Sequence, residues 1–525
     1  MKKTVILCCR QAILKIINFA CRFGAFPVSR QCLWIFLFLL ILILCNLQFI
    51  AKSGDAIHKW FMIRIYLETG TFQPIQPDHH LLRWGLIWPV VALCKIFGSS
   101  IYVYYLYPVF CYCVCGILFF LLARQILSRE TAPFAVLFYA FYPVIIHGGT
   151  QFLPMVPATM WILLTLLFTL RFIDSLQKNC LWMIAAGVSL VFAYGCKGTS
   201  FFWAPGIFLF LAFAPAKKYC FGWGKIHLTW GMLFFFLVCV AGMGLETLII
   251  NSIYGCRWGR YELLLGSHLL GDTQVGNYAT VWSYPFSFLR QLRWDGKYYT
   301  FIPQNLSIFM GCAGAFLLLL RQREMIHRHF LAVAFLGAYF CHCYVVFKLN
   351  PISYPERAIH RYLIALIAVG FLLFCAVLPE VKKWCCAGRK WRWGLIAILS
   401  SLWFLTIVIY DINARINDGN LFQLERMRQV VPEALKNGDA VGVVTERKKV
   451  EPDAAGRVLP DKWGLLHLRC WGEVPMFFDI LKNRCEFTPY DSKRVIVWLT
   501  LPGNGKKEIL LDQFSIIDRK TMPDR

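Results

Sequence analysis

The stretch LWIFLFLLILILCNLQFIA, Leu33–Ala51, decides the fold class of this chain. It is apolar throughout, and its length matches the roughly 20 residues that a helix needs to cross ~30 Å of hydrocarbon. Hydrophobic residues make up 58% of the chain and charged residues 16%, whereas a soluble domain carries about a quarter charged residues. The sequence therefore predicts a polytopic α-helical membrane protein.

Similar apolar runs recur as far as Tyr410 and predict about eleven transmembrane helices. The expected spans are Leu33–Ala51, Ile101–Leu122, Ala132–His147, Val156–Leu170, Leu181–Gly195, Phe201–Ala214, Leu228–Ile250, Pro303–Leu320, Phe330–Phe347, Tyr362–Leu378 and Trp393–Tyr410.

The net charge of +25 follows the expected topology. If residues 1–32 form a basic cytoplasmic tail, the cytoplasmic segments hold 21 basic against 4 acidic residues, and the outer segments before residue 412, with the outer ends of the spans, hold 14 against 9, as the positive-inside rule requires. The charge therefore indicates orientation and needs no nucleic-acid partner. We expect an integral protein of a bacterial-type inner (plasma) membrane with a cytoplasmic N-terminus.

Three regions follow from this topology. The tail 1–32 precedes a transmembrane module, 33–411, which carries two long outer loops, 52–98 and 251–302. An odd number of spans places 412–525 outside. Its mixed charge and alternating pattern predict a small soluble α/β domain, with strands at 440–445, 494–499 and 509–517, helices at 421–431 and 475–483, and Cys470 and Cys485 as a candidate disulfide pair.

The first outer loop concentrates polar groups beside apolar ones. Residues 55–69 predict an amphipathic helix that ends at Gly70, with Asp55 and Lys59 paired at i, i+4. The segment PDHHLLRWGLIWPV, Pro77–Val90, then begins a second interfacial helix over 81–97. Ionisable groups at the hydrocarbon boundary are costly and usually face a cavity. We therefore expect an outward-opening cavity lined by acids and cations.

Cations beside an apolar groove suit a lipid phosphate, because guanidinium groups bind phosphate oxygens in forked pairs. A carboxylate near that phosphate could take a proton from an incoming hydroxyl. The sequence has no recognisable nucleotide-binding motif, neither a P-loop nor a dinucleotide fingerprint. A lipid-linked sugar donor would explain that absence, since sugar nucleotides stay in the cytoplasm.

The first loop resembles that of GT-C glycosyltransferases, above all the aminoarabinose (lipid A) transferase and protein O-mannosyltransferase family. Asp55 stands at the family's acidic position, Glu68-Thr69-Gly70 at its turn, Asp78-His79-His80 at its acid-Lys-Pro motif, and Phe97-Gly98 at the loop's end. The segments His360–Gly370 and Thr150–Leu164 resemble a late span and the fourth span. The resemblance implies sugar transfer from a polyprenyl-phosphate donor to a glycan, lipid or protein acceptor.

These observations lead to one functional hypothesis and one alternative. Asp55 is the expected general base, and the expected substrate-binding residues are Asp78, His79, His80, Arg83, Lys197, Arg357, His360 and Arg361. The sequence identifies no definite cofactor, and a divalent cation could assist with Asp55, Asp78 or a histidine as ligand. The alternative function is a transporter or flippase of lipid-linked sugars, which would need polar residues through the full depth of the membrane.

Overall fold

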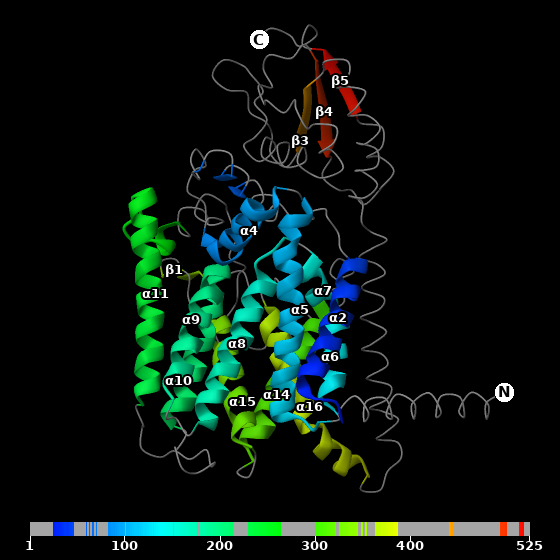
Figure 1. Cartoon of the computed structure of the whole chain (residues 1–525), viewed down its shortest axis with the longest axis vertical. Coiled ribbons are helices and arrows are strands. Elements are labelled where there is room, and N and C mark those ends of the chain that lie inside the picture. Colours follow the sequence, from blue (N-terminus) through cyan, green and yellow to red (C-terminus); the bar gives the residue numbers. More distant parts are fainter. Residues whose placement is uncertain are drawn as a thin grey trace, which may run out of the picture. The chain divides into compact units, whose positions relative to one another are not determined.

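The structure is a computed structural model of the whole chain (Figure 1). It describes residues 25–46, 59, 62–63, 66–67, 70, 82–99, 101–129, 131–150, 152–175, 179–213, 229–263, 301–321, 325–344, 348–349, 352–353, 363–386, 440–445, 494–500 and 514–518.

Apolar helices dominate the described residues. Four of them are long and apolar enough to cross a membrane: Val28–Asn46, Tyr102–Ile126, Met155–Asp174 and Trp230–Tyr254. Five shorter apolar helices accompany them. The chain is therefore an integral membrane protein, while the number of eleven spans stays a prediction.

The described helices are α2 (Val28–Asn46), α4 (Trp84–Phe97), α5 (Ile101–Ile126), α6 (Ala132–Phe141), α7 (Pro143–Thr150), α8 (Met155–Asp174), α9 (Leu181–Cys196), the 3-10 helix η2 (Gly198–Phe202), α10 (Trp203–Phe213), α11 (Trp230–Tyr254), α14 (Phe301–Leu319), α15 (Ile326–Tyr344) and α16 (Ile364–Cys386). Strands β1 (Lys348–Leu349) and β2 (Ile352–Ser353) pair antiparallel. Two compact units result, the first formed by 1–47, 75–92 and 106–411 and the second by 48–74, 93–105 and 412–525.

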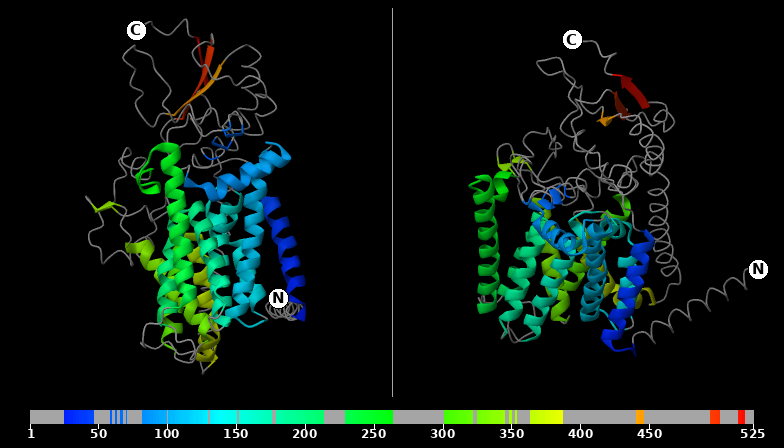
Figure 2. Two further views of the ribbon diagram at one scale, coloured as in Figure 1. Left: turned by 60° about the vertical axis from the view of Figure 1, so that its left-hand side comes forward. Right: turned by 45° about the horizontal axis from the view of Figure 1, so that its top comes forward.

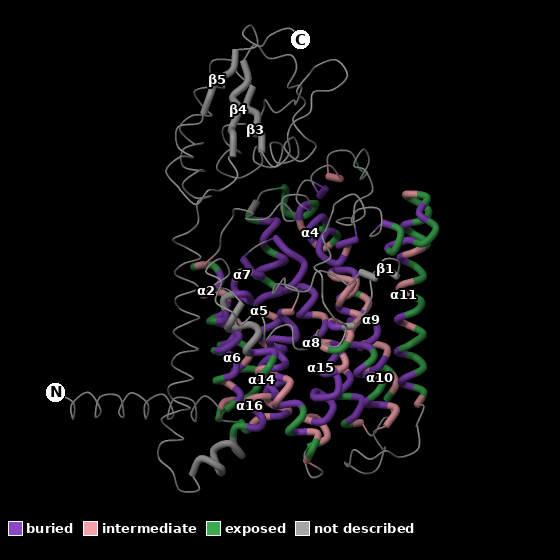
Figure 3. The backbone as a smooth tube through the Cα atoms, turned by 180° about the vertical axis from the view of Figure 1, so that it is seen from behind, coloured by how far each residue is buried: buried purple, intermediate pink, exposed green. Residues whose placement is uncertain are grey.

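In the first unit, α9 packs against both α8 and α11, and these three helices lie side by side in the views of Figures 1 and 2, while α10 packs against α15. Helix α2 buries Gln31, Ile35, Leu39 and Ile43, which recur every four residues and so form a single stripe. Figure 3 shows exposed residues along most of the length of α11. A helix that stays apolar on its exposed face is suited to contact lipid.

The expected span 132–147 corresponds to a pair of helices with a break between them. The structure breaks it into α6 and α7, which are bent by 70°. Tyr142 between them is extended, with ψ 118°. The cause is Pro143, because a proline disfavours the helical conformation of the residue before it.

Glycines allow α4 and α9 to pack at close range. A Cβ at Gly85 would lie 2.8 Å from both the Cys196 nitrogen and the Phe192 oxygen, and a Cβ at Gly195 would overlap the Trp84 ring. Each helix therefore brings a residue without a side chain to the contact. This packing places Trp84 against the end of α9.

In the second unit, the described residues of the first loop are helical at 59, 62–63 and 66–67. Gly70 ends this helix as expected: its φ is +73°, and its N–H donates to the Tyr66 carbonyl at 2.9 Å. Lys59 of this helix is buried, with 1% of its surface exposed.

The second unit also holds a three-stranded sheet of β3 (Ala440–Thr445), β4 (Arg494–Thr500) and β5 (Phe514–Asp518). Strand β3 pairs parallel with β4, in the register Val441 to Ile496, and β4 pairs antiparallel with β5. The strands lie where the alternating pattern predicted them. The expected helices at 421–431 and 475–483, the expected span 393–410 and the cysteine pair lie outside the described residues, so the α/β organisation stays a prediction.

Candidate functional site

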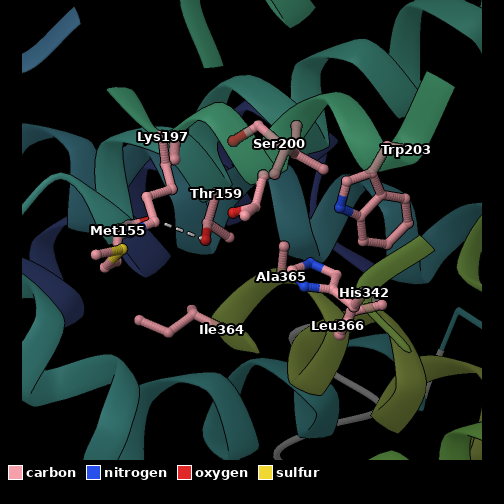
Figure 4. A pocket seen from close by; sticks show the side chains of 12 residues that line it. Met155, Thr159, Lys197, Ser200, Trp203, His342, Ile364, Ala365 and Leu366 are labelled. Carbon is pink, nitrogen blue, oxygen red and sulfur yellow. Dashed lines mark hydrogen bonds between the residues drawn. The ribbon is translucent and has the colours of Figure 1, made fainter. Parts of the chain in front are cut away.

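A pocket lies in the first unit where α8 begins, α9 and α15 end, and α16 begins (Figure 4). It opens to solvent, and the empty space between its walls, open solvent included, is about 320 Å³. Polar and apolar groups share its walls. Its lining residues are Met155, Ala158, Thr159, Ile162, Lys197, Thr199, Ser200, Trp203, His342, Ile364, Ala365 and Leu366.

Lys197 lies at the break between α9 and η2. Its φ of −151° and ψ of 121° are extended, although its N–H still donates to the Ala193 carbonyl at 2.8 Å. Its own carbonyl accepts from the Ser200 N–H at 2.9 Å and so begins η2. The local fold therefore holds Lys197 at a helix junction, where its ammonium group joins the pocket wall.

Three other polar side chains come from different helices. Thr159 on α8 donates its hydroxyl proton to the Met155 carbonyl at 2.9 Å, so towards the pocket it can only accept. His342 on α15 packs edge-on against the Phe202 ring, 4.8 Å between centroids. Trp203 on α10 is buried, and Figure 4 shows its indole nitrogen on the side of the ring nearer Ala365 and His342.

A buried ion pair forms a second polar cluster in the same unit. Glu246 of α11 and Arg260 are 6% and 7% exposed and bind through two contacts, Nε to Oε2 at 2.9 Å and Nη2 to Oε1. Trp84 Nε1 donates to Glu246 Oε1 at 2.6 Å, and Arg260 Nη2 also donates to the Leu82 carbonyl at 3.0 Å. The pair thus connects α11 to the start of α4.

Two glycines return the chain after α11 so that Arg260 can reach Glu246. Gly255 and Gly259 have positive φ angles of +69° and +54°. Between them, Cys256 packs with Leu82, Ile250 and Leu263 in a small apolar cluster. Burial and, secondly, the Glu262 carboxylate raise the pKa of the Cys256 thiol. That thiol therefore stays neutral and acts as an apolar contact.

Arg260 retains one unused donor. Its Nη1 is buried and has no hydrogen-bond partner within the described part of the chain. The guanidinium carbon lies 4.0 Å from the centre of the Tyr194 ring, and Nη1 lies 3.4 Å from where a Cβ of Gly198 would be. A buried, unsatisfied guanidinium N–H is unfavourable by itself and is a ready donor to an anion.

The structure describes two of the expected site residues. Lys197 lines the pocket, whereas Arg83 is not among the lining residues; it is 7% exposed and acts electrostatically on the Cys196 thiol, as Arg260 does. The other expected site residues lie outside the described residues: Asp55, Asp78, His79, His80, Arg357, His360 and Arg361. The pocket residues Ile364–Leu366 follow the last three of these in sequence.

Within the described ranges, no group of three His, Cys, Asp or Glu side chains could hold a metal ion. The pocket lining supplies an ammonium group, hydroxyls and one imidazole, and an ammonium group repels a cation. These described lining residues alone do not fit a divalent metal, and the expected ligands Asp55 and Asp78 lie outside the described residues.

Sequence reasoning missed Glu246, Arg260 and Trp84. A signal was present for Glu246, because a carboxylate inside an apolar span is costly and requires a partner. Arg260 carried no such signal, since it falls in an outer loop where a solvated arginine is ordinary.

One family model matches the chain. It is described as dolichyl-phosphate-mannose-protein mannosyltransferase, and it matches residues 85–243. The predicted family resemblance is confirmed for this segment. The matched residues contain α5 to α10, nearly all of α4 and the first part of α11, and they supply Thr159, Lys197, Ser200, Trp203 and several of their neighbours in the pocket. None of the curated proteins compared with the chain matches it.

Two solved structures illustrate the similarity in fold. The oligosaccharyltransferase AglB from Archaeoglobus fulgidus, in complex with an inhibitory peptide and a dolichol-phosphate, has a TM-score of 0.44 at 13% identity over 78% of this chain. ArnT from Cupriavidus metallidurans, bound to undecaprenyl phosphate, has a TM-score of 0.47 at 13% identity, covering 87% of this chain and 78% of ArnT. The chain spans 59% of the length of AglB.

Proposed function

We propose that the chain is a membrane glycosyltransferase that moves a sugar from a polyprenyl-phosphate-linked donor to an acceptor at the outer face of the membrane. The family match over 85–243 carries this proposal, because the family acts with a dolichyl-phosphate-linked sugar and the matched segment supplies much of the pocket wall. The orientation expected from the loop charges places this end of the helices outside.

The reaction needs a base and a stabilised leaving group. An oxygen of the acceptor hydroxyl attacks the anomeric carbon, Asp55 takes the hydroxyl proton, and the bond from that carbon to the phosphate oxygen breaks. The lipid phosphate departs with the bonding electrons and gains negative charge. Cationic donors directed at that charge lower the barrier.

The cations that we propose for the leaving phosphate come from three places. Arg357, His360 and Arg361 precede the pocket residues of α16, and Arg83 precedes α4. Arg260 is added by the geometry, since Glu246 orients its guanidinium group while Nη1 stays unused among the described contacts. Asp78, His79 and His80 remain proposed donor- or acceptor-binding residues of the first loop.

The test is transfer by the purified full-length protein, reconstituted in vesicles with a radiolabelled prenyl-phosphate sugar and candidate acceptors. We expect Asp55→Asn to lower kcat by about 10²- to 10⁴-fold, the usual contribution of a general base. The matched control is Asp174→Asn. Asp174 pairs with His327 at 2.6 Å where α8 ends and α15 begins, the end opposite to the pocket, and we expect its variant to stay within about twofold of wild type.

Transfer by Asp55→Asn at the wild-type rate would remove Asp55 as the base. Movement of the labelled lipid across the vesicle membrane, with no sugar transferred to any acceptor, would favour the transporter or flippase instead.

A further inference from the structure

Three arginines lie at one corner of the first unit, where α5 ends and α2 and α6 begin, at the end of the helices opposite to the pocket. Two of them hold the start of α2. Arg129, in the turn between α5 and α6, donates through Nη2 to the Ala25 carbonyl at 3.4 Å. Arg124, in the last turn of α5, donates through Nη1 to Gln31 Oε1 at 2.8 Å. These bonds bring two guanidinium groups to the first residues of α2.

The third arginine of this arginine corner belongs to α2 itself. Arg30 lies in the first turn of α2, with its guanidinium carbon 4.7 Å from the centre of the Phe26 ring. Within the described residues, none of the three arginines pairs with a carboxylate. Residues 1–32 contain basic residues and no acid, and Glu130 lies outside the described residues. The arginine corner therefore carries a local excess of positive charge.

The helices that begin at the arginine corner add to this charge. A helix N-terminus carries a partial positive charge, which an acid in the first turn commonly offsets. Neither α2 nor α6 has an acid in its first turn, and Thr131 makes no side-chain cap at the start of α6. Two positive helix ends and three guanidinium groups therefore lie together, an arrangement that a bound anion stabilises.

An apolar surface continues from the arginine corner along α2 and α6, which lie side by side in Figures 1 and 3. Leu37 and Phe38 on α2 and Leu137 and Phe141 on α6 are each between 38% and 46% exposed. The rings of Phe38 and Phe141 meet edge to face, with 6.2 Å between their centroids. The two helices thus share one exposed apolar surface, and this surface begins next to the arginines.

We propose that the arginine corner binds an anionic phospholipid, whose phosphate lies among Arg30, Arg124 and Arg129 while its acyl chains cover the shared surface of α2 and α6. Guanidinium groups bind phosphate oxygens in forked pairs. A zwitterionic lipid is less suited, because its own cation is repelled by the arginines. The lipid connects α2 to the turn after α5, and the expected orientation places it in the cytoplasmic leaflet. The site is independent of the pocket and of sugar transfer.

Native mass spectrometry and thermal unfolding of the full-length protein in a neutral detergent test this site. The protein is titrated with dioleoyl phosphatidylglycerol, dioleoyl phosphatidylcholine and glycerol phosphate. We expect phosphatidylglycerol to bind at least about tenfold more tightly than phosphatidylcholine and to raise the Tm. Arg129→Gln and Arg30→Gln should each weaken phosphatidylglycerol binding about fivefold, the usual contribution of one arginine near an anionic lipid.

The matched control is Arg171→Gln, which removes the same charge from an exposed arginine in the last turn of α8, at the same end of the helices. We expect its affinity for phosphatidylglycerol to stay within about twofold of wild type. A photoactivatable phosphatidylglycerol provides a measurement on the wild-type protein, which remains informative if a variant does not fold. Its cross-links should map to peptides from α2 and α6.

Four results would overturn the proposal. Equal affinity for phosphatidylglycerol and phosphatidylcholine would remove the selectivity for an anion. Equal weakening in Arg171→Gln and Arg129→Gln would indicate general attraction to a basic surface. Glycerol phosphate binding as tightly as phosphatidylglycerol would make the arginine corner a site for a free phosphate, and cross-links found only on other helices would place the lipid elsewhere.

Discussion

The buried pair of Glu246 and Arg260 shows what a single residue contributes to this protein. Glu246 lies in an apolar helix, where an unpaired carboxylate would be strongly unfavourable. Its partner comes from the residues that follow the same helix, and the positive φ angles of Gly255 and Gly259 make the return possible. The pair also holds Leu82 and Trp84, so it stabilises the start of α4.

Breaking this pair should destabilise the protein. Glu246→Gln leaves the Arg260 guanidinium buried without a counter-charge, which costs about 3–5 kcal/mol in comparable buried pairs. We expect a lower Tm in detergent and loss of sugar transfer. Thermal unfolding and the transfer assay measure the two effects separately.

A double variant separates structure from function at this pair. Glu246→Leu with Arg260→Met removes both charges, and such replacements are often neutral or stabilising. We expect its Tm to recover towards wild type, while transfer stays low because the phosphate has lost a donor. Recovery of both would show that Arg260 acts only in folding.

The sequence predicted part of this site. Lys197 was identified because a lone cation between two apolar runs is unusual, and it does line the pocket. The pair of Glu246 and Arg260 was not predicted, because the loop charges indicate only on which side of the membrane a loop lies. The positive φ angles of Gly255 and Gly259 determine where Arg260 lies, and the local sequence pattern does not predict them.

At the scale of elements, the hydrophobic runs located most helices to within a few residues, because length and apolarity are local properties. The bend between α6 and α7 was missed although Pro143 stands at it. The packing of α4 on α9 could not be predicted, since it depends on Gly85 and Gly195 meeting across more than a hundred residues of sequence.

That packing gives a test with a matched control. In Gly85→Ala the new methyl would meet backbone atoms of Phe192 and Cys196 at 2.8 Å, so the helices must separate. We expect a loss of about 1–3 kcal/mol, typical of overpacking, measured as a lower Tm, together with reduced transfer. Gly244→Ala on α11 has open space around it and should be neutral or stabilising. Equal Tm values for the two variants would contradict the close contact.

For the whole molecule, the sequence predicted orientation as well as fold class. The charge bias of the loops predicts that the N-terminal tail lies in the cytoplasm and that residues 412–525 lie outside. Contacts within the described helices do not depend on that orientation, which therefore needs its own measurement.

Reporter fusions provide that measurement. Alkaline phosphatase fused after Arg525 should be active, because it folds only outside the cytoplasm, and green fluorescent protein at the same place should stay dark. The same reporters fused within the expected cytoplasmic loop near Lys217 should give the reverse result. An inactive phosphatase at Arg525 would require an even number of spans or an inverted protein.

Helix α11 connects the ion pair to the membrane itself. Its 25 residues rise about 37 Å, against ~30 Å of hydrocarbon. A helix longer than the hydrocarbon layer tilts by an amount that depends on the thickness of that layer. Glu246 lies about two turns before the end of α11. Lipids with longer or shorter acyl chains should therefore shift Glu246 against Leu82 and Trp84, and the rate of sugar transfer should change with acyl-chain length even when donor and acceptor are saturating.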